Sequence, residues 1–225
     1  MTKAQAGILA PLPEQGRYVF FTLAGSGAAL TSALSKLQAT AVDGKVVVGI
    51  GLQVLQKMGK QLSLMREFPH LKGAMFEAPS TPYALCLWLR SDQRGELLAI
   101  TAKLASMLAP AFKIDHAVDT FLHERTASGH GRDLTGYEDG TENPEADAAV
   151  AASITAGQGE GVDGSSFWAL QQWMHDYAAF GRMSVNEQDN TVGRRCSDNE
   201  ELEDAPESAH VKRTAQESFE PEAFV

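Results

Sequence analysis

The stretch RYVFFTLA, from Arg17 to Ala24, is the first of a series of strand-like segments that decides the fold. It is rich in the β-branched and aromatic residues that favour strands, and three segments of the same kind follow it along the chain. They are KVVVGIGL (Lys45–Leu52), YALCLWLR (Tyr83–Arg90) and IDHAVDTFL (Ile114–Leu122). We therefore predict four strands upstream of His123.

Two helices are predicted between these strands. In the segments Ala28–Gln38 and Arg94–Leu108, leucine and isoleucine recur every three or four positions, which places them on one face of a helix. The order strand, helix, strand, strand, helix, strand is that of a ferredoxin-like unit. We expect an α+β fold in which residues 53–82 form an insertion outside the sheet, beginning with a short helix at Leu52–Gly59.

The composition of the chain changes after Leu122. Residues 123–150 are polar and rich in glycine, which predicts a long ordered loop that ends at the start of a helix, and such loops are usually functional. The segment SSFWALQQWMHDY (Ser165–Tyr177) predicts a strand, Asn186–Asn190 a short helix, and the final EAFV the opening of another strand. We therefore expect a first ferredoxin-like repeat at residues 1–135. Residues 136–225 are expected to hold the loop and an incomplete second repeat, as in dimeric α+β-barrel folds.

Composition narrows the class of protein. The chain has 225 residues, 44% of them apolar, and a net charge of −10 that argues against nucleic acid and anionic membrane surfaces as partners. Its apolar runs are far shorter than the ~20 residues of a membrane span, and its N-terminus shows no signal peptide. The two cysteines form no CxxC or CxxCH motif and predict no disulfide, so we expect a cytoplasmic protein.

The most specific stretch is GYEDGTENP, from Gly136 to Pro144, in which two glycines bracket the carboxylate of Asp139. A tight turn of this kind presses a carboxylate against a flat ligand with no Cβ in the way. The alternative is an ordinary turn before a helix, with Asn143 as N-cap and Pro144 at the first helical position. The residues alone leave both interpretations open.

Histidine and arginine supply the other candidates. His210 follows an acidic run and precedes a helix-favouring stretch, where its imidazole either binds a metal or is an ordinary surface group. Arg194 and Arg195 suit a ligand carboxylate, or pair with the acidic residues that follow them. His175 lies among aromatic residues on the predicted strand and is more typical of a half-buried structural residue. No HxxxH, HExxH or Cys/His quartet occurs.

Two of these stretches resemble a known family. Gly136–Asn143 is similar to the GxxDG signature of the dye-decolourising haem peroxidases, and Gly193–Thr214 resembles their proximal-histidine region, about 70 residues further on. The resemblance is closest to the cytoplasmic bacterial branch, called B or P type. It implies a two-repeat ferredoxin-like fold that binds haem b, with His210 as the iron ligand and Asp139 as the acid and base on the peroxide side.

The resemblance further implies cofactor contacts from Glu138, Gly140, Thr141, His175 and Arg194, in addition to Asp139 and His210. The implied activity is reduction of hydrogen peroxide with oxidation of dyes, phenols or similar reductants. The implied partners are these small molecules, further copies of the chain in a homo-oligomer, and an encapsulating shell protein.

The chain departs from the family at its end. It stops at Val225, before the strand that should bring the distal arginine, which implies a truncated form. Two other functions therefore stay open. One is a haem-binding or structural fragment without turnover, and the other is a plain ferredoxin-like oligomerising domain in which Asp139 and His210 are structural.

Overall fold

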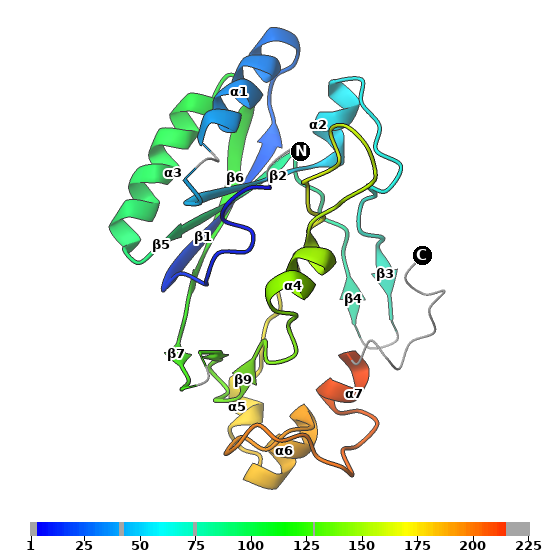
Figure 1. The fold of residues 1–225 in the computed structure, drawn as a ribbon. Coiled ribbons are helices and arrows are strands. Elements are labelled where there is room, and N and C mark those ends of the chain that lie inside the picture. The colour runs from blue at the N-terminus through cyan, green and yellow to red at the C-terminus, as the bar shows by residue number, and fades with distance from the viewer. Residues whose placement is uncertain (1–3, 41–42, 74–75, 128, 215–225) are drawn as a thin grey trace. The chain divides into compact units, whose positions relative to one another are not determined.

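The computed structural model describes residues 4–40, 43–73, 76–127 and 129–214 (Figure 1). The chain forms two compact units. The first unit comprises Met1–Phe121 with Asn143–Leu170, and the second unit comprises Leu122–Glu142 with Gln171–Val225. Residue 135, where the sequence suggested a boundary, lies inside the second unit, and the division into residues 1–135 and 136–225 stays a prediction.

A four-stranded antiparallel sheet forms the first unit, in the order β2-β5-β1-β6. Its elements in chain order are β1 (Gln15–Leu23), α1 (Gly27–Thr40), β2 (Val46–Ile50), β5 (Leu85–Ser91), α3 (Arg94–Leu108) and β6 (Phe112–Phe121). The two central strands are thus the first and third of the series, with the second and fourth at the edges. This is the ferredoxin-like arrangement, and the prediction of an α+β fold of that type is confirmed.

The hydrophobic core lies between this sheet and the two helices, which cover the same face of it (Figure 1). Successive strand residues point to opposite faces, so Val19 and Phe21 of β1 enter the core together with Leu85, Leu87 and Leu89 of β5. The helical leucines expected from their spacing meet them: Leu30 and Leu37 from α1 and Leu97, Leu104 and Leu108 from α3 are buried. The periodic pattern of the sequence therefore predicts the core directly.

The opposite face of the sheet carries aromatic side chains. Tyr18 stacks on Trp88 with ring centroids 5.9 Å apart, and Trp168 tilts against Tyr18 at 5.7 Å. The ring of Trp168 also lies over Gly49, where a Cβ would come within 3.0 Å of it. The side chain of Trp168 therefore packs over this face.

The strand predicted at Ser165–Tyr177 is wrong, and with it the expected first strand of a second repeat. Ser165–Asp176 have no regular secondary structure, and Tyr177 begins the short helix α5 (Tyr177–Phe180). The reason is that a strand needs a neighbour for its backbone hydrogen bonds, and none of the described strands pairs with this segment. The expected strand at EAFV lies outside the described residues.

The insertion between β2 and β5 contains α2 (Leu52–Lys57), which matches the expected short helix, and a hairpin of β3 (Leu71–Lys72) and β4 (Glu77–Ala78). The helix start expected at Asn143 is also displaced. Helix α4 (Ala146–Ser153) has Glu145 as its N-cap, so neither Asn143 nor Pro144 has the role that the turn-and-cap interpretation gave it.

The second unit consists of short elements. A small antiparallel sheet contains β7 (Glu124–Arg125), β8 (Gly131–Arg132) and β9 (Glu138–Asp139), and the helices are α5, α6 (Val185–Val192) and α7 (His210–Thr214). Among the described residues, no helix combines the length and the apolar character that a membrane crossing requires.

Candidate functional site

Asp139 lies on a hairpin formed by β8 and β9. Asp133 shapes its turn, because the Asp133 carboxylate accepts a hydrogen bond from the amide of Thr135 at 2.7 Å and the Asp133 carbonyl accepts from the amide of Gly136 at 3.1 Å. Gly136 and Gly140 have φ angles of +90° and +80°, in the left-handed region that favours glycine. The two glycines therefore permit the sharp changes of direction on either side of Asp139.

The side chains of Glu138 and Asp139 differ in their surroundings. Glu138 is only 13% exposed and forms an ion pair with the Nη2 of Arg132 at 3.1 Å. Asp139 is exposed, and within the described part of the chain its carboxylate makes no hydrogen bond or ion pair. Consecutive strand residues alternate in direction, so the hairpin holds Glu138 inward and presents Asp139 outward.

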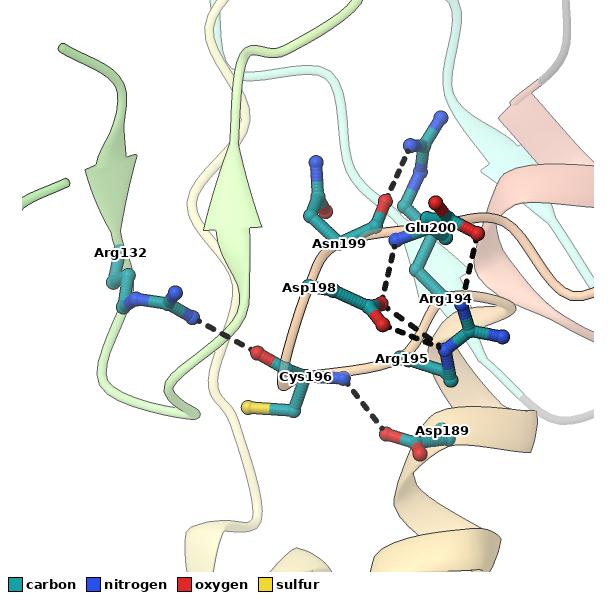
Figure 2. Close-up of polar contacts among 8 residues, drawn as sticks. All are labelled: Arg132, Asp189, Arg194, Arg195, Cys196, Asp198, Asn199 and Glu200. Carbon is teal, nitrogen blue, oxygen red and sulfur yellow. Dashed lines mark hydrogen bonds and ion pairs between the residues drawn. The ribbon is translucent and has the colours of Figure 1, made fainter. Parts of the chain in front are cut away.

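Arg132 connects the hairpin to the loop that follows α6. Its Nη1 donates to the carbonyl oxygen of Cys196 at 3.2 Å (Figure 2). The same nitrogen donates to the carbonyl oxygen of Gly136 at 2.6 Å. The side chain is 21% exposed, so its charge is partly removed from water and is offset by Glu138. Arg132 thus joins the hairpin to a residue that lies 64 positions further along the sequence.

A second connection runs through Tyr137 and Asp189. The hydroxyl of Tyr137, which is 4% exposed, donates to the Asp189 carboxylate at 2.5 Å, and the amide of Cys196 donates to the same oxygen at 3.0 Å. Burial raises the pKa of Tyr137 well above its usual value, and the hydrogen bond with Asp189 and the negative charge of Asp189 raise it further. The Cys196 thiol donates to the Gly136 carbonyl at 3.3 Å. The hairpin, α6 and the following loop therefore share one hydrogen-bond network.

The two adjacent arginines of this loop are engaged by carboxylates. Arg194 donates to Glu142 at 2.7 Å and lies 3.6 Å from Glu201. Figure 2 shows Arg195 beside Asp198 and Glu200, with contacts of 3.0 Å and 2.8 Å. The pairing alternative considered for these arginines is thus the arrangement in this structure, and the binding of a cofactor carboxylate by Arg194 stays a prediction.

His210 is the first residue of α7. Its side chain is exposed, and the described residues provide its imidazole with no hydrogen-bond partner. Helix α7 packs against α6, and Gly193 at the end of α6 permits this approach because a Cβ there would lie 2.3 Å from a methyl group of Val211. The close packing fixes the start of α7 and hence the position from which His210 projects.

The remaining predicted site residues also lie in the second unit. Thr141 is half-buried and borders a hollow of about 560 Å³, together with Arg132, Glu138, Asp198 and Asn199. His175 lies in the segment without regular structure, where its ring contacts Tyr177 at 5.5 Å. The structure thus brings Glu138, Thr141 and the Arg194 loop together, whereas His175 belongs to a separate exposed segment.

Sequence analysis did not single out the residues that build the network, namely Arg132, Tyr137, Asp189 and Cys196. Tyr137 lies inside the GYEDG stretch, which was its one available signal. Arg132 and Asp189 follow no periodic pattern, because their contacts join segments far apart in the sequence. Only the three-dimensional structure could identify them.

Comparison with known proteins shows what the chain is similar to. Residues 130–223 match the family model described as "Dyp-type peroxidase, C-terminal". The dye-decolorizing peroxidase of Mycobacterium tuberculosis is 28% identical over 218 residues, which cover 91% of this chain and 64% of that protein. This chain therefore spans less than two thirds of the length of that relative.

Solved structures agree in fold. A variant of DypB from Rhodococcus jostii in complex with heme has a TM-score of 0.77 at 23% identity, covering 93% of this chain and 71% of that one. The encapsulated DyP-type peroxidase of Mycobacterium smegmatis has a TM-score of 0.75 at 25% identity, covering 94% and 71%. The chain has the fold of Dyp-type peroxidases, and its resemblance to the dye-decolourising peroxidase family is confirmed.

Proposed function

We propose that this chain is a haem-dependent peroxidase that reduces hydrogen peroxide and oxidises small-molecule reductants such as dyes and phenols. One observation carries the proposal: in the second unit, Asp139 and His210 have side chains without protein partners among the described residues, whereas Arg132, Arg194 and Arg195 are each paired with a carboxylate. An exposed carboxylate and an exposed imidazole of this kind are available to a ligand.

The donor set suits haem b. An imidazole is a common ligand of haem iron, and His210 is the residue that would hold the iron. When bound, haem supplies the redox chemistry. We assign contacts with it to Glu138, Gly140, Thr141 and His175, and to Arg194, whose guanidinium would exchange Glu142 for a cofactor carboxylate.

Asp139 supplies acid and base chemistry in this proposal. Its free carboxylate accepts a proton from one oxygen of hydrogen peroxide and returns it to the other, which needs a group that is not already engaged in an ion pair. The hairpin keeps this carboxylate accessible, because Glu138 and not Asp139 satisfies Arg132.

We propose a homo-oligomer as the assembled form. We further propose a cytoplasmic location, which both free cysteines support, since reduced thiols are typical of that compartment. The Mycobacterium smegmatis peroxidase is encapsulated, which supports a shell protein as a partner of this chain too. Nucleic acid and membranes are not among the proposed partners.

The test is a titration of the purified chain with haemin, followed by stopped-flow mixing with hydrogen peroxide. His210→Ala should abolish tight haemin binding, and Asp139→Ala should retain haemin but slow the reaction with peroxide by about 100- to 10,000-fold. His123→Ala and Asp147→Ala, which alter exposed residues outside the site, serve as controls.

Each alternative predicts a different result. Haemin binding without any reaction with peroxide would favour a haem-binding protein without turnover. A chain that binds no haemin, or a His210→Ala variant with an unchanged haemin spectrum, would overturn the assignments made here.

A further inference from the structure

In the second unit, Arg132 makes hydrogen bonds to the backbone in addition to its ion pair. Its Nη1 donates to two backbone carbonyls, Gly136 at 2.6 Å and Cys196 at 3.2 Å, while its Nη2 pairs with the Glu138 carboxylate at 3.1 Å. Two of the three acceptors, Gly136 and Glu138, belong to the segment that leads to Asp139, and the third, Cys196, belongs to the loop after α6. A single side chain therefore restrains the hairpin at two points and joins it to a distant loop.

These contacts bear on Asp139 through the backbone. Gly136 and Glu138 lie three residues and one residue before Asp139, and β9 pairs Glu138 with Arg132 itself across the hairpin. Fixing both residues leaves the peptide that carries Asp139 little freedom to rotate. Arg132 does not contact the Asp139 carboxylate, so any effect on it must act through position.

The third contact connects the hairpin to the chain that leads to His210. Cys196 lies in a loop that Arg194 and Glu201 close by an antiparallel bridge, and the Arg194 guanidinium also donates to the Asn199 carbonyl at 3.0 Å (Figure 2). The loop is thus held by its own hydrogen bonds, and Arg132 attaches the hairpin to it.

We propose that Arg132 is a positioning residue for Asp139, holding the Asp139 turn against the loop of residues 193–202. This inference rests on the proposed function, in which Asp139 handles the protons of peroxide. Arginine suits the task because its planar fork presents several donors at fixed angles, whereas lysine has one nitrogen and glutamine no charge. A displacement of about 1 Å at a catalytic group is enough to slow a reaction by roughly 100-fold.

The first experiment is hydrogen–deuterium exchange of the full chain without haemin. Arg132→Gln should speed exchange of the amides in residues 133–142 and 193–199 by about 10-fold, because it removes charge-assisted hydrogen bonds to both segments. Arg132→Lys should give a smaller increase. Arg94→Gln, which alters an exposed arginine of the first unit paired with Asp119, should change neither segment.

The second experiment is a double-mutant cycle on the haemin-loaded chain. Arg132→Gln should slow the reaction with hydrogen peroxide by about 10- to 100-fold when Asp139 is present. In an Asp139→Ala background the same change should alter the rate by less than about 2-fold, because residues that act through one another are not additive. The shift of the Soret band on haemin binding should be the same with and without Arg132.

The outcomes separate this inference from the proposed function. Equal slowing in both backgrounds, or unchanged exchange in residues 133–142, would overturn the positioning role. If the unsubstituted chain binds no haemin, the proposed function fails. The exchange experiment then decides by itself whether Arg132 holds the turn.

Discussion

Tyr137→Phe removes one hydroxyl from the network of the second unit and leaves the aromatic ring in place. The hydroxyl is 2.5 Å from the Asp189 carboxylate, and Tyr137 is 4% exposed, so water cannot readily replace the bond. Hydrogen bonds to charged groups contribute about 1.5–3 kcal/mol. The substitution should therefore destabilise this unit by that amount, which corresponds to exchange about 10- to 150-fold faster for amides that open with the network.

Hydrogen–deuterium exchange resolves this effect by segment. The amide of Cys196, which donates to the same Asp189 oxygen, is the main reporter, and peptides from β5 in the first unit provide an internal reference. Tyr177→Phe is the matched control, because Tyr177 is 44% exposed and its hydroxyl has no partner among the described residues. Exchange near Cys196 that changes by less than about 2-fold would refute the reasoning. An equal increase in β5 would point to a general loss of stability instead.

Three further predictions concern the first unit. Leu87→Ala should lower the free energy of unfolding of this unit by about 2–5 kcal/mol, since Leu87 is fully buried. Urea denaturation followed by Trp88 fluorescence measures this change. Leu9→Ala, at an exposed position, should have little effect. Gly51→Ala should destabilise the same unit by about 1–3 kcal/mol, because a Cβ there would lie 1.9 Å from the Tyr83 carbonyl oxygen; a melting temperature equal to that of the unsubstituted chain would contradict it. Burial raises the pKa of the Cys86 thiol from 9.0 to about 12. The contribution of Cys86 to the free energy of unfolding is therefore intact below pH 9.0 and declines as the pH rises towards 12, because the thiol ionises first in the unfolded chain. From pH 8 upward, the difference in free energy of unfolding between the unsubstituted chain and Cys86→Ala should shrink by up to about 1.4 kcal/mol per pH unit, and a constant difference would argue against the shift.

The first unit could be predicted well because its signals are local. The helix predicted at Arg94–Leu108 has the observed bounds, and the four predicted strands overlap the observed strands β1, β2, β5 and β6. The period of the apolar residues in each segment indicates whether it is a helix or a strand, and the order of these elements then restricts the topology. Interior positions such as Leu87 and Leu104 follow from that pattern without knowledge of the structure.

The second unit could not be predicted in the same way, because pairing between distant segments determines it. The composition of Ser165–Tyr177 favours a strand, yet the segment has no described partner strand, and Trp168 packs on Gly49 and Tyr18 instead. Period and propensity indicate what a segment can form. Whether a neighbour exists to complete its hydrogen bonds is a property of the whole chain.

The candidate site shows the same division between local and distant information. The glycines on either side of Asp139 predict the turn from the sequence alone, and their positive φ angles agree with that prediction. The contacts that hold the turn come from Arg132 and Asp189, and their partners in the loop after α6 are up to 64 residues away. A motif search therefore finds the group that reacts more easily than the groups that position it.

The pattern of paired and unpaired charges is itself an argument about function. Arg132, Arg194 and Arg195 each bind a carboxylate of the second unit. The chain has more acidic than basic residues, so carboxylates are in excess over the arginines that bind them. A carboxylate paired with an arginine is less able to accept a proton, because a nearby cation favours its ionised form. The hairpin instead gives Arg132 to Glu138, the adjacent residue. A carboxylate that makes no ion pair, in a unit whose arginines are paired with other carboxylates, is suited to proton transfer. Glu138→Gln removes the charge that holds Arg132 and should therefore loosen the turn and slow the reaction with hydrogen peroxide, which stopped-flow mixing of the haemin-loaded variant measures.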